Sequence, residues 1–384
     1  MRLSHDPAAR RRLAALGAAA AVALVVGIVI GAAGGADDEP EPEPAATPAE
    51  REAARGREAR EAVDRLSLRR QVGQLVISSF DEPTRPDYIR RRLQAGETAG
   101  VILFGRNGGD ATHWRRLTRS LQDAARGRAL VMVDQEGGDI RTVSFAGPAA
   151  GQASQGAAEQ VEATARDAAR QLREVGVNVN LAPVADVAER GGVPSVMDGR
   201  AFAGGPDEVA AATRASIRGM RSARVAATAK HFPGLGGSQI NTDDAPATVQ
   251  GEIDSDLVPF EAAIAERVPL VMLSHALYPA LDADAIASQS RAIASGLLRE
   301  QLGFEGVVVT DSMEAQAVLA GSGVADASVR AVRAGADLVL LTGSASWNEV
   351  FPRLLEEARA DPEFRARVHE SAARVLALKG SLLG

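Results

Sequence analysis

Charged side chains stand at the ends of several short apolar runs in this sequence. Asp134 follows ALVMV, Lys230 and His231 follow VAATA, His275 follows LVMLS, and Asp311 follows GVVVT. A carboxylate at the end of a buried strand is held in one orientation, which suits the nucleophile of a covalent mechanism. Asp311 is therefore a candidate nucleophile. The alternative is that it caps a following helix, since Asp and Ser are favoured caps.

A glycine-rich segment, KHFPGLGGSQINTDDAP at 230–246, offers a second carboxylate. It lacks the G-x-x-x-x-G-K-[ST] pattern of nucleotide-binding loops, so nucleotide binding has little support. One carboxylate on a strand and another on a loop is an arrangement that glycoside hydrolysis can use. Asp243 and Asp244 are the loop candidates. A solvated turn is the alternative for this Asn-Thr-Asp-Asp stretch.

Two further acids and an arginine are candidates for binding a ligand. Asp134 and Glu136, in DQEGG, point to the same side if the chain stays extended. Such a pair can bind a divalent metal or accept hydrogen bonds from sugar hydroxyls. No His-x-x-x-His or comparable pattern accompanies them, which favours the sugar. Arg200, in DGRAF, can fork to a substrate oxygen at the rim of a site, or it is solvated in an open loop.

The apolar runs that precede these residues alternate with amphipathic stretches. Strands separated by helices form a parallel sheet, and eight such units over roughly 310 residues match a (β/α)₈ barrel of the TIM type. A doubly wound open sheet is the alternative, but no glycine-rich fingerprint follows the first run. Barrel enzymes carry their sites at the carboxyl ends of the strands, where the charged residues fall here. The expected strands lie within 74–80, 99–105, 129–135, 177–184, 225–232, 270–277, 306–312 and 337–343, and the expected helices at 110–126, 157–175, 206–223, 255–267, 293–302, 324–333 and 346–359.

The first 62 residues differ from the rest of the chain. Residues 1–12 form a basic tail, and residues 13–36 carry no charge and are long enough to cross a bilayer as a helix. Arginines before this segment and acids after it predict a cytoplasmic N-terminus and a catalytic body outside the membrane. A cleaved signal peptide, which would leave the body secreted, and a buried core helix are the alternatives.

An acidic, proline-rich linker is expected at 37–62, because alternating Glu and Pro cannot build a core. Within and just beyond it, the charged stretch 51–65 is helix-prone and predicts a solvated helical lead-in. The barrel is expected to occupy 63–384.

The composition excludes several classes of protein. The chain contains no cysteine, which excludes a disulfide scaffold and a thiol nucleophile. Its net charge of −7 and aromatic content of 3% disfavour a nucleic-acid partner, which would need a basic stripe or stacking platforms. The composition leaves the oligomeric state open.

Six segments together resemble glycoside hydrolase family 3, in its short, single-barrel β-N-acetylglucosaminidase branch. They run in the family's order and cover nearly all of 70–345, and KHFPG with a downstream LGFEGVVVTDS is the most specific pair. The segments are DQEGG (134–138), NVNLAPVADV (178–187), DGRAF (198–202), KHFPG (230–234), SHALYP (274–279) and GLLREQLGFEGVVVTDSME (296–314).

The resemblance implies a two-step retaining mechanism with no metal or organic cofactor. Asp311 stands where the family has the nucleophile that forms a glycosyl-enzyme. The positions at which the family holds the sugar's hydroxyls and N-acetyl group are Asp134, Arg200, Lys230 and His231. His275, in SHALYP, joins them as a substrate-binding candidate.

Two departures from the family pattern concern the site. The family's loop usually reads KHFPGHG and then, after four residues, Asp-Ser-His, in which the His is the acid/base. Here Asn241 replaces that Asp and Asp243 replaces the His. Asp243 is therefore the best available acid/base, with a pKa raised by closure of an apolar loop. In addition, Asp139 occupies the place where the family commonly has an Arg after the two glycines, and Arg141 lies two positions later.

The leading expectation is an exo-acting β-N-acetylhexosaminidase that removes terminal β-linked N-acetylglucosamine from cell-wall fragments or related glycans. Two alternatives stay open. A catalytically weak glycan-binding protein is one, because a scaffold can outlast its site. A β-glucosidase or β-xylosidase on the same fold is the other.

Overall fold

The computed structural model describes residues 47–188 and 194–383. The expected basic tail, the apolar segment 13–36 and the first part of the linker lie outside the described residues. Within the described ranges, no helix is both long enough and apolar enough to cross a membrane.

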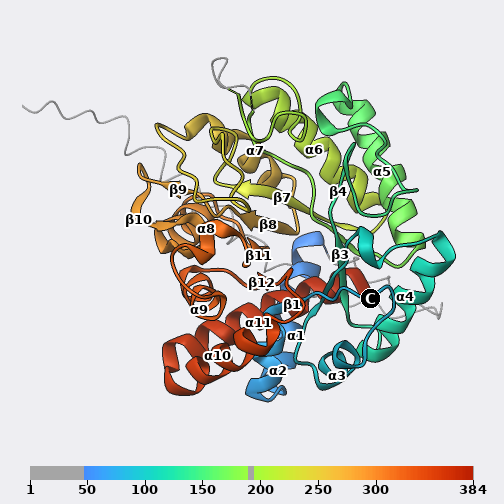
Figure 1. Cartoon of the computed structure of the whole chain (residues 1–384), viewed down its shortest axis with the longest axis vertical. Helices are drawn as coiled ribbons and strands as arrows, with labels where there is room; N and C mark the ends of the chain where they lie inside the picture. The colour runs from blue at the N-terminus through green and yellow to red at the C-terminus, as the bar shows by residue number, and fades with distance from the viewer. Residues whose placement is uncertain (1–46, 189–193, 384) are drawn as a thin grey trace, which may run out of the picture. The chain divides into compact units, whose positions relative to one another are not determined.

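Eight short parallel strands close into a barrel, and helices lie around it (Figure 1). Each strand falls inside one of the eight apolar runs, which confirms the predicted closed barrel and excludes the open sheet. The order of strands around the barrel is β1-β12-β11-β8-β7-β6-β3-β2, and all neighbours are parallel. The strands are β1 (Val76–Ser78), β2 (Gly100–Ile102), β3 (Leu130–Val133), β6 (Val179–Asn180), β7 (Ala226–Phe232), β8 (Leu270–Leu273), β11 (Val307–Ser312) and β12 (Leu338–Leu340).

The outer layer confirms the seven expected helices to within a residue or two at most ends. The buried residues of each helix recur at helical spacing, so one side of the helix covers the barrel. The seven are α4 (Ala111–Ala125), α5 (Ala158–Glu174), α6 (Pro206–Ser222), α7 (Asp254–Ala265), the π-helical η4 (Ala292–Gln301), α9 (Val324–Ala334) and α10 (Trp347–Ala360). Shorter helices add α2 (Leu68–Gly73), α3 (Asp87–Ala95), α8 (Gln316–Leu319) and the 3₁₀ turns η1 (Gly105–Asn107), η2 (Gln152–Ser154) and η3 (Ala287–Gln289).

Two small hairpins extend from the carboxyl ends of the barrel strands. The first joins β4 (Gln135–Gly137) to β5 (Ile140–Arg141) directly after β3. The second joins β9 (Leu277–Tyr278) to β10 (Asp282–Ile286) after β8. Because both hairpins follow strand ends, they lie at the carboxyl end of the barrel.

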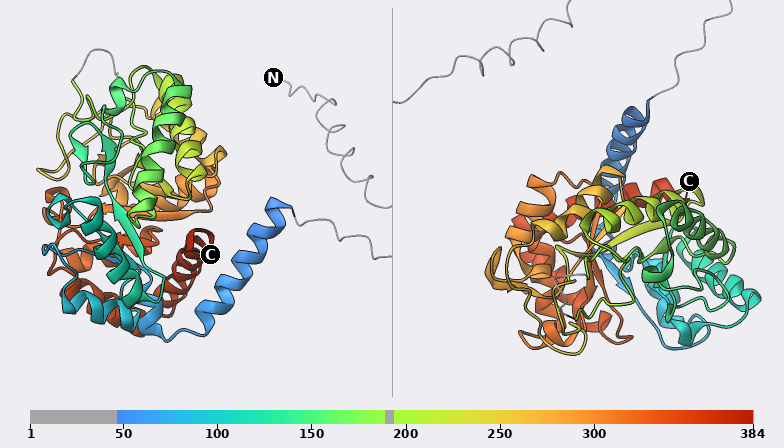
Figure 2. Two further views of the ribbon diagram at one scale, coloured as in Figure 1. Left: turned by 90° about the vertical axis from the view of Figure 1, so that its right-hand side faces the viewer. Right: turned by 90° about the horizontal axis from the view of Figure 1, so that it is seen from above.

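Helix α1 (Pro48–Asp64) begins inside the stretch expected to be linker. Thr47 and Glu50 form a reciprocal capping box at its start, which fixes where the helix begins. The helix lies alongside α11 (Pro362–Leu383), as Figure 2 shows. Its Ala59 and Val63 side chains are buried. The expected helical lead-in is therefore present, but it starts three residues earlier, and its second half buries two side chains instead of being solvated on every face.

Helix α11 closes the barrel at the amino ends of the strands. Its apolar side chains Val375, Leu378 and Leu382 join the cluster that fills the barrel interior. Lys379, on the same helix, donates a hydrogen bond of 2.8 Å to Gln74, just before β1. This closed end leaves the opposite, carboxyl end as the open face of the barrel.

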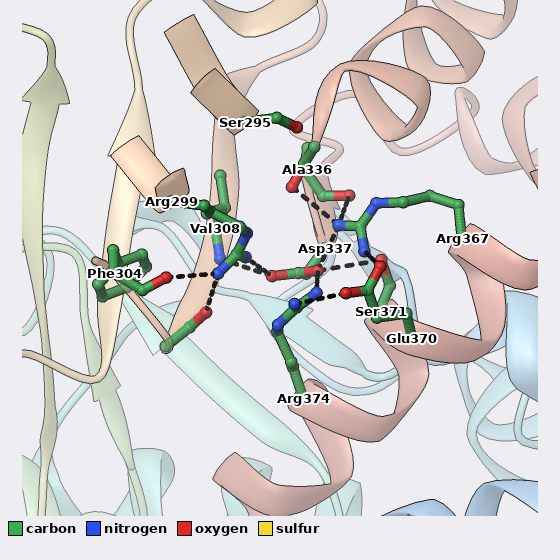
Figure 3. A network of polar contacts seen from close by, with 12 residues as sticks. Ser295, Arg299, Phe304, Val308, Ala336, Asp337, Arg367, Glu370, Ser371 and Arg374 are labelled. Carbon is green, nitrogen blue, oxygen red and sulfur yellow. Dashed lines mark hydrogen bonds and ion pairs between the residues drawn. The ribbon is translucent and has the colours of Figure 1, made fainter. Parts of the chain in front are cut away.

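A buried ion network fixes α11 to the barrel wall (Figure 3). Asp337, fully buried at the start of β12, accepts hydrogen bonds from the backbone N–H of Val308 and from Ser371. Three guanidinium groups surround the same carboxylate: Arg299 at 2.5 Å, Arg367 at 2.6 Å and Arg374 at 3.3 Å. The arginines come from η4 and α11, so one carboxylate ties two helices to two strands.

Candidate active site

A pocket of about 760 Å³ opens at the carboxyl end of the barrel. Its floor is apolar, made by Ile102, Leu181, Met272 and Leu340 at the ends of barrel strands. Its walls are polar and come from the loops after β2, β3, β6, β7, β11 and β12. Six of the seven site residues predicted from the sequence line it: Asp134, Arg200, Lys230, His231, Asp243 and Asp311.

Lys230 is the centre of a buried charge cluster in one wall. Its Nζ lies 2.7 Å from Asp134 Oδ1 and 2.6 Å from Glu136 Oε1. Arg200 forks onto the same Glu136, at 2.8 and 3.0 Å. Asp134 and Glu136 therefore do point to the same side. Glu136 is almost fully buried; although burial alone would raise its pKa, the charges of Lys230 and Arg200 lower it to about 2.

This cluster leaves some hydrogen-bonding capacity free for a ligand. Asp134 and Arg200 each keep 26% of the side chain exposed, whereas Lys230 keeps 3% and Glu136 keeps 2%. The two more exposed groups can contact a sugar directly. The two buried groups hold them in place, because an ion pair enclosed in protein has one well-defined geometry.

His231 is oriented by a buried aspartate from the loop after β6. Its Nδ1 lies 2.7 Å from Asp186 Oδ2, and Asp186 Oδ1 accepts the backbone N–H groups of His231 and Leu235 at 3.1 and 2.7 Å. This arrangement turns the other ring nitrogen, Nε2, toward the pocket. That nitrogen is 3.9 Å from Asp311 Oδ2.

Asp311 is the last residue but one of β11, and its side chain is 21% exposed and lines the pocket. Its Oδ1 accepts the backbone N–H of Ser312 at 2.8 Å. Burial opposes ionisation, but the neighbouring basic side chains, His231 first, hold the pKa of Asp311 below its ordinary value. A carboxylate that is fixed, ionised and open to a pocket meets the requirements of a nucleophile.

His275 lies behind Asp311 and is fully buried, outside the residues that line the pocket. Its Nδ1 is 2.7 Å from Ser288 Oγ, and its Nε2 donates to the carbonyl oxygen of Ser312 at 2.8 Å. Both ring nitrogens are thus engaged by the protein. The geometry fits a residue that positions the end of β11 rather than one that touches a ligand.

Asp243 lies in the loop after β7, in the wall of the pocket. Desolvation by the surrounding protein, followed by the negative charge of Asp311, raises the pKa of Asp243 to about 6. Asn241 Oδ1 accepts the backbone N–H of Asp243 at 3.1 Å, so Asn241 shapes the turn. Because the pKa of Asp243 is raised and the pKa of Asp311 is lowered, Asp243 can act as an acid while Asp311 is ionised and can act as a nucleophile.

Two backbone hydrogen bonds dock this loop on the short helix α8. Gln316 N–H donates to Asp243 O at 3.2 Å, and Ala317 N–H donates to Thr242 O at 3.1 Å. Because α8 follows directly after Asp311 and its neighbours, the loop that carries one carboxylate is tied to the segment that carries the other.

Sequence patterns do not predict that two residues of the site position other side chains. They make Glu136, together with Asp134, a candidate for binding a ligand, and they include Asp186 only as a member of NVNLAPVADV. The structure shows that both hold another side chain of the pocket. The sequence signal for Glu136 is its spacing of two residues from Asp134. Asp186 is a buried acid after an apolar strand, and no local pattern predicts that it binds a histidine 45 residues away.

The comparisons with known proteins agree with this geometry. The N-terminal domain of glycosyl hydrolase family 3 matches residues 67–378. A beta-hexosaminidase of Xanthomonas campestris pv. campestris is 35% identical over 264 residues, which are 65% of this chain and 78% of that protein. The matched range of the family domain contains every residue that lines the pocket.

Two solved structures are also similar. A glycoside hydrolase family 3 beta-N-acetylglucosaminidase from a Paenibacillus species superposes with a TM-score of 0.78 at 34% identity, over 82% of this chain and 62% of that one. A beta-N-acetylhexosaminidase from Beutenbergia cavernae superposes with a TM-score of 0.76 at 34% identity, over 82% of this chain and 99% of that one.

Proposed function

Since the chain belongs to glycosyl hydrolase family 3, we propose that it is an exo-acting, retaining β-N-acetylhexosaminidase. It releases terminal β-linked N-acetylglucosamine from cell-wall fragments or related glycans. The names of the beta-hexosaminidase and beta-N-acetylglucosaminidase relatives support this substrate. The observation that carries the proposal is the pair of carboxyls in one pocket, Asp311 with a lowered pKa and Asp243 with a raised one.

The proposed reaction has two steps. In the first, Asp311 forms a bond to the anomeric carbon while the bond from that carbon to the leaving oxygen breaks, and Asp243 gives its proton to that oxygen. In the second, Asp243 takes a proton from water as the water oxygen attacks the anomeric carbon and releases Asp311. The same residue serves as acid and then as base, as a retaining mechanism requires.

The charge cluster is proposed to bind the sugar. Asp134 accepts from a hydroxyl and Arg200 donates to a sugar oxygen, since these two keep the most exposed area. Lys230 and His231 also line this pocket: Lys230 holds Asp134 and Glu136 in place through its Nζ, and His231 presents its Nε2 beside Asp311. His275 supports Asp311 from behind through the Ser312 carbonyl.

We also propose that this reaction takes place outside the cytoplasmic membrane, with residues 13–36 as a single span or, if cleaved, as a secretion signal. The uncharged run between arginines and acids supports this proposal. Expression of the full chain followed by fractionation and external protease treatment tests it. Protein that stays in the cytoplasmic fraction and resists external protease would contradict it.

Hydrolysis of aryl N-acetyl-β-glucosaminide by the full chain tests the activity. We expect turnover that falls at least a thousandfold in Asp311→Asn, with the fold intact by circular dichroism, because a glycosyl-enzyme can no longer form. Retained turnover in that variant would overturn the mechanism. Faster hydrolysis of an aryl glucoside would replace the proposed sugar, and saccharide binding without any turnover would mean a glycan-binding protein.

A further inference from the structure

Four cationic side chains line the pocket, and three of them already have a carboxylate partner. Arginine and lysine in a pocket usually meet an anion, either from the protein or from a ligand. The three satisfied pairs are Lys230 with Asp134 at 2.7 Å, Arg200 with Glu136 at 2.8 Å, and Arg106 with Asp81 at 2.7 Å. The fourth is Arg141.

Arg141 forms no ion pair with any residue that the structure describes. It lies on β5, opposite Gln135 of β4, so the hairpin holds its backbone beside the charge cluster. Its Nε is buried and has no hydrogen-bond partner among the described residues. Asp139, two residues earlier in the sequence, is exposed and forms no ion pair with Arg141. Because that Nε is enclosed by protein, a ligand reaches Arg141 through its two terminal Nη groups, which form no hydrogen bond with a described residue and can donate to an anion in the pocket.

We propose that Arg141 forms an anion-binding subsite of this pocket and takes an oxyanion carried by the glycan, for which a carboxylate is the best geometric match. A guanidinium offers two parallel donors to a carboxylate, whereas a single sugar hydroxyl uses only one. This subsite deepens the proposed function and rests on it, because it concerns a substituent of the substrate that Asp311 cleaves.

The other charges of the pocket make this recognition selective. The pocket also contains acids that no lysine or arginine pairs with: Asp243, Asp311 and Glu314. An anionic substituent placed near them would be repelled. Arg141 therefore defines where in the pocket a negative charge is accepted. The oxyanion can be carried by the leaving group or by the terminal sugar, and in both cases the Arg141 guanidinium would bind it in the same way.

The test compares acidic with neutral substrates on the full chain. One arm uses the N-acetyl-β-glucosaminide of a hydroxybenzoate and of its methyl ester; the other uses 4-nitrophenyl N-acetyl-β-glucosaminide with and without a 6-O-sulfate. The measured quantity is the ratio of kcat/KM for the acidic and the neutral member. The acidic and neutral substrates differ in intrinsic reactivity. This difference is the same for every protein, so it cancels when the ratio of a variant is compared with the ratio of the wild type.

In one of the two arms, we expect the ratio to fall at least tenfold in Arg141→Gln, which is about 1.4 kcal/mol. Arg141→Lys should keep part of the preference, because it retains the charge and loses the fork. The matched control is Arg106→Gln, which removes a cation from the same pocket that Asp81 already neutralises, and it should leave the ratio unchanged. The arm that responds identifies the source of the anion.

A ratio that does not change in Arg141→Gln in either arm would overturn the subsite, and so would an equal fall in Arg106→Gln. These outcomes are distinct from failure of the proposed function. That failure would appear as the absence of hydrolysis of the neutral aryl N-acetylglucosaminide by the wild-type chain.

Discussion

At the scale of single residues, the site consists of groups whose charge is set by their neighbours. Asp311 stays ionised beside basic side chains, and Asp243 is desolvated near the Asp311 charge, which keeps it protonated to higher pH. The sequence was sufficient to nominate both carboxyls, because one ends an apolar strand and the other lies in a loop rich in glycine. It could not show that His275 faces away from the pocket, since strand ends do not reveal which side a histidine points to.

The pH dependence of kcat/KM follows from these two groups. The acid must be protonated, so activity is present below the pKa of Asp243, about 6, and falls tenfold per pH unit above it. The nucleophile must be ionised, so activity is lost again at low pH, below the lowered pKa of Asp311. Profiles measured on a neutral aryl substrate in wild type and Asp243→Asn check this. An alkaline limb that persists unchanged in Asp243→Asn would assign the acid to another group.

The Glu136→Gln variant tests the support of the charge cluster. Removing its charge leaves Lys230 and Arg200 with weaker anchors, so we expect kcat/KM to fall at least tenfold, with a raised KM as Arg200 loses its orientation. Steady-state kinetics alongside a thermal melt separate misplacement from unfolding. The matched control is Glu162→Gln, which also loses an arginine partner but on the exposed face of α5. A fall of similar size in both variants would contradict the positioning role.

At the scale of elements, the apolar runs of the sequence predict the barrel strands. They do not predict that helix α11 closes the barrel at the amino ends of those strands. Strands β3, β8 and β12 carry Leu, Val or Met at every position, as strands buried on both faces do. Helix α11 has buried residues spread around more of its surface, because it contacts the barrel interior, the ion network and α1, and this weakens the one-sided pattern by which a helix is recognised. Helix α3 has too few apolar residues to stand out.

Asp337 is the residue on which the position of α11 depends. In Asp337→Asn, three arginines lose their common anion in a buried site, so we expect a loss of about 3 kcal/mol or more in the free energy of unfolding. Urea unfolding followed by circular dichroism measures it. Glu370→Gln is the control, because that carboxylate is 55% exposed and pairs with two of the same arginines. A loss in the control as large as that in Asp337→Asn would contradict the role of burial.

At the scale of the whole molecule, one buried lysine makes stability depend on pH. Burial first, and then the charge of Arg128, lower the pKa of Lys379 to about 7. The unfolded chain keeps the ordinary lysine value near 10.4. Between these values the unfolded state binds more protons, so the free energy of unfolding rises with pH from about 7 to about 10 and gains nothing from this group below 7.

We expect Lys379→Met to lose this rise. Urea unfolding at pH 7 and pH 9 measures the difference for the variant and for wild type. Glu363→Gln, an exposed change on the same helix, serves as the control and should keep the wild-type pH dependence. A wild-type stability that is the same at both pH values would show that Lys379 remains charged when folded.

The central claim is that Asp311 forms a covalent bond to the sugar, and trapping this intermediate tests it most directly. The full chain is incubated with a 5-fluoro N-acetylglucosaminyl fluoride, digested and examined by mass spectrometry. We predict one added sugar on the peptide that contains Asp311, and no label in Asp311→Asn. Label on a different residue, or turnover of aryl N-acetylglucosaminide with inverted configuration at the anomeric carbon, would contradict the account.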